Sequence, residues 1–403
     1  MLKLALRNIF RHRFRTAMTL AGIVMGVTGL VLSGGFVQDI YAQLAEALIH
    51  SQFGHIQVAH AGYFTVGSRS PEKYAIANPN ELRDKISALP EVIEVLERSN
   101  FSGLLNNGRT DWPIVGEGVE PAKEAKLGSF MRIVAGRQLA DGDRFGILVG
   151  QDIAKALKLA PGDRVTLLAN TAEGALNTLE FEVVGVFESF SKDFDARAVR
   201  IPLRATQELL GSQRVNALVV ALKHTEDTGP VAARLAAMLD PTQFEMRTWD
   251  QLSDFYDKTV ALYSQQFGFL QVIILAMVLL TVANSVNMSV FERIGEFGTM
   301  MALGKRSSQI LGLIVVEGTL LGLIGSFLGI ALGVGLAVGI SSIGIPMPPP
   351  PNANLGYTAV IRIVPGVLAT AFSVGFLATT LAAMLSAVRI SRTPVADALR
   401  ANV

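Results

Sequence analysis

Four stretches of the chain are long, apolar and almost without charge, and no other feature restricts the fold as strongly. They cover Ala17–Phe36, Phe267–Phe291, Ile310–Ile340 and Ile363–Val388. Three of them contain no charged residue, and the remaining one contains only Glu317. About 20 apolar residues in a helix cross the hydrocarbon core of a bilayer. The sequence therefore predicts four transmembrane helices.

Two alternatives compete with this prediction. Core helices of soluble domains can be apolar, but they seldom remain uncharged over so many residues. A cleaved signal peptide has a shorter apolar region than Ala17–Phe36, and no small-x-small cleavage site separates this run from a polar segment. Charged residues make up 17% of the chain, against about 25% in an average globular protein. Both the run lengths and the composition favour membrane spans.

Lysine and arginine residues gather on one side of the predicted spans. They occur at the chain start, between the second and third spans, and in the tail: Lys3, Arg7, Arg11, Arg13, Arg15, Arg293, Lys305, Arg306, Arg389, Arg392 and Arg400. The loop 341–359 contains neither Lys nor Arg. Because cytoplasmic loops are rich in these residues, we expect a multi-pass protein of the cell inner membrane with both termini in the cytoplasm.

The predicted fold class is an α-helical membrane protein with four transmembrane helices and a large α+β extracytoplasmic (periplasmic) domain between helices 1 and 2. The expected parts are a cytoplasmic amphipathic helix at 1–16, spans at 17–36, 267–291, 310–340 and 363–388, an external domain at 37–266 with helical stalks at 37–50 and 253–266, a cytoplasmic coupling helix and loop at 292–309, an outer loop at 341–362, and a cytoplasmic tail at 389–403.

Within the external domain, alternating and β-branched segments predict strands, and 3.6-residue periodicity predicts helices. The expected strands are 55–59, 146–149, 164–168, 180–187, 198–201 and 217–222, and the expected helices are 79–89, 152–157, 205–210 and 229–239. The segment 110–131 has no clear period and receives no assignment. The proline run 346–351 predicts a polyproline II connector.

The third span carries the most informative intramembrane residues. Its glycines recur about every four residues, which places small side chains on one face and allows close helix packing; they are Gly318, Gly322, Gly325, Gly329 and Gly333. A carboxylate in hydrocarbon is costly. We therefore expect Glu317 to contact Asn284, Asn287 or a basic group of the inner loop, with a snorkelling carboxylate as the alternative.

Motifs for catalysis or cofactor binding are not evident. The sequence has no cysteine, no HExxH and no GxSxG. Residues Gly298–Lys305 deviate from a phosphate-binding loop, since the spacing of the glycines is one residue too long and Arg306 follows. We expect no metal site and no cofactor bound by this chain, and we expect it not to bind ATP or nucleic acid.

The segment 292–309 combines charge with exposed apolar character. Glu292 and Glu296 stand one helical turn apart, while Phe297, Met300 and Leu303 supply an apolar surface. Gly304 ends the expected helix. A short helix of this kind, with Arg293 near its start, suits docking to a cytoplasmic partner; a solvated connector is the alternative.

Several segments together resemble the MacB/FtsX/LolC-type ABC transporter permeases of the mechanotransmission class. They are NSVNMSVFERIGEFGTMMALGKRSSQI (284–310), VEGTLLGLIGSFLGIALG (316–333), LALRNIFRHRFRTAMTLAGIVMGV (4–27), VGQDIAKALKLAPGDRVTLLA (149–169), FEVVGVFESF (181–190) and ISRTPVADALR (390–400). The resemblance extends over nearly the whole chain in the same order. Gly295 and Phe297 depart from the usual family pattern.

The resemblance implies a partner and a mechanism. A separate cytoplasmic ABC ATPase dimer would hold ATP and Mg²⁺, and the helix from Glu292 to Leu303 would sit in a groove of that ATPase. A second permease copy or a homologue would complete the complex. ATP-driven closure would tilt the spans and move the external domain through its stalks, without a channel for cargo. The chain itself would be a non-catalytic subunit.

The resemblance to the lipoprotein-releasing permeases implies extraction of lipoproteins or other lipophilic cargo from the outer leaflet. An acyl chain could then be lined by apolar residues of the first span and stalk and of the second span, namely Met25, Phe36, Ile40, Leu44, Phe267 and Leu270. Plain helix packing is the alternative role for them. Export of a peptide or antibiotic with periplasmic and outer-membrane partners, and FtsX-like signalling to a periplasmic hydrolase, remain open as alternative functions.

Overall fold

The computed structural model describes the chain except for residues 1–4, 6, 9, 10, 12, 68–70, 77, 128–129, 350–353, 355 and 392–403. The chain separates into two compact units. The spanning unit comprises Met1–Tyr41, Thr259–Pro346 and Thr358–Val403, and the inserted domain comprises Ala42–Lys258 with Met347–Tyr357.

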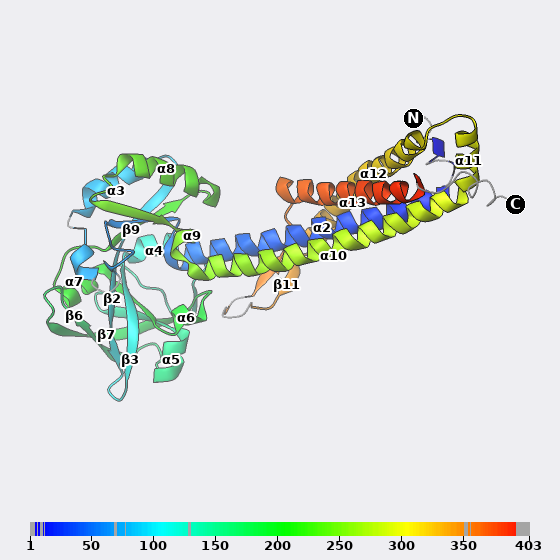
Figure 1. Cartoon of the computed structure of the whole chain (residues 1–403). Coiled ribbons are helices and arrows are strands. Elements are labelled where there is room, and N and C mark those ends of the chain that lie inside the picture. The colour runs from blue at the N-terminus through cyan, green and yellow to red at the C-terminus, as the bar shows by residue number, and fades with distance from the viewer. Residues whose placement is uncertain are drawn as a thin grey trace. The chain divides into compact units, whose positions relative to one another are not determined.

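Long helices build the spanning unit (Figure 1). They are α2 (Arg13–Leu48), α10 (Asp254–Glu292), α12 (Ser307–Ile343) and α13 (Pro365–Ser391), with the short α11 (Ile294–Ala302) between α10 and α12. Among the described residues, four helices are long and apolar enough to cross a membrane. The predicted fold class, four spanning helices with a large domain between the first two, is confirmed.

Helix α2 contacts each of the other three long helices. A Cβ added at Gly329 of α12 would lie 2.7 Å from Cβ of Val27, and one added at Gly375 of α13 would lie 2.4 Å from Cγ2 of the same valine. A Cβ added at Gly26 would lie 2.5 Å from Cγ2 of Val278 in α10. Small residues at these crossings let the helix axes approach closely. Figure 1 shows α2 and α10 running side by side.

Between α12 and α13 the chain forms a small hairpin of β11 (Ile345–Met347) and β12 (Tyr357–Ala359). The predicted polyproline connector is therefore wrong at Pro346 and Met347, which belong to a paired strand. Residues 350 and 351 of the connector lie outside the described residues. Of the hairpin's strand residues, Met347 and Tyr357 are assigned to the inserted domain and the others to the spanning unit.

The inserted domain contains a mixed sheet that folds into two halves. Its strands are β1 (Ile56–His60), β2 (Val92–Asn106), β3 (Asp111–Val119), β4 (Arg132–Gly136), β5 (Gly146–Gly150), β6 (Arg164–Asn170), β7 (Leu176–Glu188), β8 (Ala198–Pro202), β9 (Ala217–Leu222) and β10 (Phe244–Thr248). One half is an antiparallel sheet in the order β10-β1-β9-β2. In the other half, β2-β3-β8-β5-β7-β6 closes into a ring, because β6 pairs with both β7 and β2.

Each half has its own hydrophobic core. Helices α5 (Gln151–Leu157) and α7 (Leu203–Leu210) close the ring, whose core includes Leu105, Val149 and Phe181. Helices α3 (Pro79–Ser87) and α8 (Thr228–Met238) contribute to the other core. The remaining short helices of the domain are α4 (Pro121–Leu127), α6 (Lys192–Asp195) and α9 (Trp249–Leu252). Strand β2 belongs to both halves and so joins them.

The predicted strands and helices of this domain are all present, but others were missed. These are β2, β3, β4, β10, α4, α6 and α9. The unassigned segment 110–131 resolves into β3 and α4. Pro113 in β3 and the polar centre of β2 hide the period of two on which strand prediction depends.

Candidate functional site

The segment that links α10 to α12 turns sharply at Arg293. This residue has φ −107° and ψ 9°, outside helical geometry, so α10 ends at Glu292 and α11 begins at Ile294. The predicted helix 292–303 is therefore too long: α11 ends at Ala302, and Leu303 caps it. Gly304 follows with φ +91°, a conformation that glycine adopts without strain.

A network of charged side chains holds this turn against the bundle. Arg293 Nη1 donates to both carboxylate oxygens of Glu317, at 3.2 and 3.0 Å. Its Nε lies 3.3 Å from Glu296, which also pairs with Arg11 at 3.4 Å. Asn8 donates to Glu317 at 2.5 Å. The network therefore ties the N-terminal segment, the start of α11 and α12 together.

The three partners considered for Glu317 have different positions in the structure. A basic group of the inner loop, Arg293, is the one that contacts it. Asn284 is exposed and Asn287 is half-buried, and the described hydrogen bonds of Glu317 go to neither. Nothing in the sequence marks Asn8 as a partner, because it lies 309 positions away from Glu317.

The apolar residues of the turn divide into a packed and an exposed group. Met300 is half-buried against the core of the bundle. Leu303 is 81% exposed and Phe291 is 71% exposed. The side chain of Phe297 lies outside the described side chains. Large exposed apolar side chains mark surfaces for a partner, and Leu303 lies in the turn, beyond the predicted span that ends at Phe291.

The glycines of α12 lie against two different helices. Gly318 and Gly322 face Ala383 and Thr379 of α13. Gly325, Gly329 and Gly333 face Ile23, Val27 and Val31 of α2. One glycine face thus serves two crossings, because α12 passes from one neighbour to the other along its length.

An ion pair that sequence reasoning missed lies on the other side of the spanning unit. Asp39 of α2 is fully buried, and its carboxylate accepts from Arg362 Nε at 3.1 Å and from the backbone N–H of Val360 at 3.0 Å. Arg362 N–H also donates to the carbonyl of Gly35 at 3.2 Å. A single acidic residue within an otherwise uncharged helical segment was the available signal.

The six residues predicted to line a lipophilic cavity lie in different environments. Met25 is 74% exposed and Leu270 is 38% exposed, whereas Phe36 and Ile40 are half-buried. Phe267 packs against Gly34 of α2. Leu44 belongs to the inserted domain and is buried with Leu48 and Phe190.

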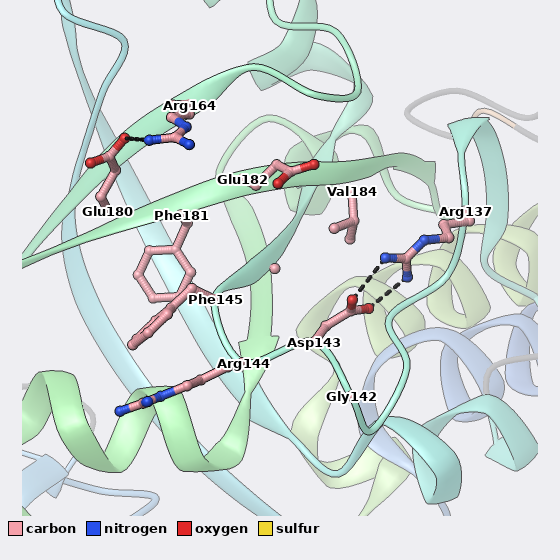
Figure 2. A pocket seen from close by; sticks show the side chains of 11 residues that line it. Arg137, Gly142, Asp143, Arg144, Phe145, Arg164, Glu180, Phe181, Glu182 and Val184 are labelled. Carbon is pink, nitrogen blue, oxygen red and sulfur yellow. Dashed lines mark hydrogen bonds and ion pairs between the residues drawn. The ribbon is translucent and has the colours of Figure 1, made fainter.

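The inserted domain carries an open pocket of about 390 Å³ beside β5, β6 and β7 (Figure 2). Arg137 forms a two-point ion pair with Asp143, at 2.6 and 2.7 Å, and Arg164 pairs with Glu180 at 3.3 Å. Arg144 lies over the ring of Phe145. Two of the arginines that line the pocket are thus paired with carboxylates of its lining, and Arg144 pairs with Glu208 beside it.

The histidines near the end of α2 do not form a metal site. His55 Nδ1 accepts the backbone N–H of Leu222 at 3.2 Å, while His50 lies 3.2 Å from Glu46. Burial lowers the pKa of His55 to about 4. His60 contacts Tyr74 instead. Among the described residues, no three His, Asp or Glu side chains are arranged to hold a metal ion.

Comparisons with known proteins agree with this architecture. The profile of the MacB-like periplasmic core domain matches residues 16–238, and that of the FtsX-like permease C-terminal domain matches residues 268–395. An ABC transporter permease of Methanocaldococcus jannaschii is 24% identical, over 92% of this chain and 91% of its own length. The macrolide export ATP-binding/permease protein MacB of Rhodospirillum rubrum is 25% identical, over the whole of this chain and 60% of its own length.

The solved periplasmic region of MacB from Actinobacillus actinomycetemcomitans is also similar. It has a TM-score of 0.37 and 14% identity, covering 53% of this chain and 95% of that structure. The chain spans only 56–60% of the length of the two MacB relatives from Hyphomonas neptunium and Rhodospirillum rubrum.

Four apolar helices with a domain inserted after the first define a multi-pass membrane protein. The chain belongs to the MacB/FtsX-type ABC transporter permeases. The resemblance stated from the sequence motifs is thereby confirmed.

Proposed function

We propose that this chain is a non-catalytic permease subunit that converts ATP hydrolysis by a cytoplasmic ABC ATPase into movement of its inserted domain. The observation that carries the proposal is the turn between α10 and α12, where Leu303 and Phe291 are exposed beside a network of fixed charges. The family supports an ATPase partner. In this proposal the ATPase supplies the ATP and Mg²⁺ sites.

The turn has the properties of a docking element. Its position is fixed by Arg293 and Glu317, while Leu303 projects from it without an apolar neighbour to cover it. An apolar side chain that inserts into a pocket contributes most of the affinity in many interfaces. Helix α11 would therefore bind the ATPase through Leu303 and its neighbours. The network of charged side chains would transmit the movement of the ATPase to α12.

The orientation of the chain forms part of the proposal. Docking to a cytoplasmic ATPase requires the Arg293 turn and both termini in the cytoplasm of an inner-membrane protein. The distribution of Lys and Arg supports this arrangement. The inserted domain would then lie outside the cytoplasm, and a second permease copy or a homologue would complete the complex.

For the cargo, we propose lipoproteins or other lipophilic molecules taken from the outer leaflet. The support is the exposed apolar surface of the first two spanning helices, which includes Met25 and Leu270. One observation favours a second candidate: two relatives, aligned over 93% and 100% of this chain, are macrolide export ATP-binding/permease proteins. Export of an antibiotic or peptide is therefore the alternative.

The ATPase contact is tested by Leu303→Asp in the full chain, co-expressed with the ATPase encoded nearest to it. We expect loss of at least nine-tenths of the co-purified ATPase. Leu176→Asp is the matched control, because Leu176 is 68% exposed but lies on the inserted domain. Glu296 is a poorer test, since its replacement also breaks the pairs with Arg293 and Arg11. Undiminished co-purification of Leu303→Asp would refute the docking assignment.

The cargo is tested with a photoreactive amino acid at Ile40 in cells. Capture of lipid-modified protein supports lipoprotein extraction. The control places the same photoreactive residue at Ile93 of β2, an exposed position on the inserted domain. Capture of a small hydrophobic compound, competed by a macrolide, would favour antibiotic export. Products that contain only this chain or a cell-wall hydrolase would exclude both cargo proposals and favour signalling.

A further inference from the structure

The two helices that enter the inserted domain are joined to it in different ways. Helix α2 continues without a loop into the π-helical turn η1 (Ile49–Phe53), and β1 begins at Ile56. Helix α10 begins at Asp254, after the short helix α9 and a break at Ser253. The contacts around each junction lie wholly within the inserted domain.

Two buried arginines bind backbone carbonyls of η1, the helical turn that continues α2. Arg200 of β8 donates from Nη2 to the carbonyl of Ser51 at 2.8 Å, and Arg98 of β2 donates to the carbonyl of Gln52. Only 1% of Arg200 and 2% of Arg98 is exposed. The last carbonyls of a helix lack partners within the helix and carry its negative dipole end. Cationic donors from two strands therefore fasten the helix end directly to the sheet.

The guanidinium groups are themselves fixed by carboxylates. Arg200 Nε donates to Glu117 of β3 at 2.8 Å, and both arginines contact Glu124 of α4. Burial alone would raise the pKa of Glu124, but the two cations outweigh it and hold this pKa below its usual value. The carboxylate is therefore ionised, and the cluster keeps its charges in place.

The backbone turn after η1 is tightly packed and hydrogen-bonded. Gly54 has φ +67°, and its N–H donates to the carbonyl of Ile49 at 2.9 Å. A Cβ at this position would lie 2.2 Å from Cγ1 of Val219 in β9. His55 N–H then donates to the carbonyl of Val220 at 3.0 Å. The chain thus passes from α2 into the sheet with every residue of the turn held by a neighbour.

At the junction of α10, the described hydrogen bonds include none from a charged side chain of the sheet, and Tyr256 packs against Trp249 of α9. Ser253 has φ −114° and ψ 88°, which interrupts the helical path. Its Oγ accepts the N–H of Tyr256 at 3.1 Å, so α10 is capped by its own neighbour. A pocket of about 400 Å³ lies directly beside the break and is lined by Leu252, Ser253, Asp254 and Phe255 together with residues of η1 and α6. The pocket also adjoins Gln52 and Phe53 of η1, so the interruption of the helix at Ser253, and not the open space alone, distinguishes this junction from that of α2.

We propose that α2 is a rigid drive lever for the inserted domain, with Arg98 and Arg200 as the positioning residues of its joint, and that α10 follows through a hinge at Ser253. The rigidity of the joint is a property of the chain alone, and the lever role rests on the proposed function. A force carried by α2 would turn the sheet with it, whereas a force on α10 would mostly bend the break.

The first test measures rigidity in the full chain without an ATPase. The sequence contains no cysteine, so engineered cysteines take nitroxide labels without background. Electron–electron distances are measured in nanodiscs for the pairs Gln43/Thr178 and Asp257/Thr178. We expect a narrow distribution for the α2 pair and one at least twice as wide for the α10 pair. Equal widths would overturn the proposal.

The joint is then weakened with a charge-balanced variant, Arg98→Met with Glu124→Met, which leaves Arg200 and Glu117 paired. Its expected effect is at least a twofold broadening of the Gln43/Thr178 distribution. The matched control is Arg137→Met with Asp143→Met, an ion pair of the same domain outside the joint. If the Gln43/Thr178 distances did not change, the pair of Arg98 and Glu124 would have only a structural role. Arg98 would then not be a positioning residue of the joint.

The lever role is tested in the complex with its ATPase and a non-hydrolysable ATP analogue, with labels at Ser342 and Thr178. Insertion of Gly-Gly after Phe53 should reduce the nucleotide-dependent distance change at least fivefold, and the same insertion after Ser253 should retain more than half of it. The reverse order would overturn the proposal. If the distance in the parent chain did not change with nucleotide, the proposed function and the lever role would both be wrong. The widths of the two distance distributions in the first test would still decide whether the joint of α2 is rigid.

Discussion

The guanidinium of Arg293 lies against both carboxylate oxygens of Glu317, and through this pair the turn before α11 is fastened to α12. Arg293 is 4% exposed and the side chain of Glu317 is 14% exposed. A buried pair of this kind offsets the cost of removing two charges from water only while both partners are present.

Loss of one partner should therefore cost more than loss of both. We expect Glu317→Gln or Arg293→Met to destabilise the helical bundle by about 3–5 kcal/mol, and the double variant by much less than the sum. Unfolding is measured by titration with SDS in mixed micelles, with circular dichroism as the signal. Additive effects of the two substitutions would show that the pair is not coupled.

The glycines of α12 provide a prediction with an internal control. A Cβ at Gly318 would lie 2.1 Å from the Cβ of Ala383, whereas nothing lies within 4 Å of a Cβ at Gly335 on the same helix. Gly318→Ala should therefore cost about 1–3 kcal/mol through overpacking. Gly335→Ala should be neutral or stabilise the helix by about 0.5–1 kcal/mol. The same SDS titration compares them, and equal effects would contradict the assigned crossing with α13.

Some parts of this structure were readable from the sequence because their cause is local. The run ALVVAL predicts β9 at 217–222, since both faces of this strand are buried. The four spans follow from the same kind of continuous apolar signal. The positions of helix ends were less accurate, as the start of α11 shows, because Arg293 leaves helical geometry where it turns toward Glu317.

Other parts depend on partners far along the chain. The centre of β2 reads as polar because it contains Glu97, Arg98 and Ser99, yet all three are buried. Arg98 can be buried only because Glu124 and the carbonyl of Gln52 meet it. Asp39 likewise depends on Arg362, 323 positions away. No local pattern encodes such pairs, so neither the joint of α2 nor the Asp39 ion pair was predicted.

One buried carboxylate makes the stability of the inserted domain depend on pH. Asp195 accepts the N–H of Ser189 and the side-chain amide of Asn354, and burial raises its pKa to about 6. The folded domain therefore binds a proton more readily than the unfolded chain between about pH 4 and 6. Acidification through this window should stabilise the domain, by up to about 3 kcal/mol for a shift of about two units.

Asp195→Asn removes this pH dependence, and its unfolding can be followed selectively. The two tryptophans of the chain, Trp112 and Trp249, both lie in the inserted domain, so their fluorescence in urea reports on this domain alone. The stability gained on substitution should be large at pH 7 and nearly vanish at pH 4. A difference that does not change with pH would show that Asp195 keeps an ordinary pKa.

A pH dependence of opposite sign comes from His55. Burial, with a smaller contribution from the nearby His50, lowers the pKa of His55 to about 4, and its Nδ1 accepts the N–H of Leu222. Here the unfolded chain binds the proton more readily, so the stabilising contribution is present above about pH 6.5 and is lost as the pH falls toward 4.

We expect His55→Asn to make the domain gain stability on acidification and Asp195→Asn to make it lose stability, each by about 3 kcal/mol over this range. The double variant should show neither of these two pH-dependent changes. Parallel profiles for the two single variants in urea titrations between pH 4 and 7 would contradict both assignments at once.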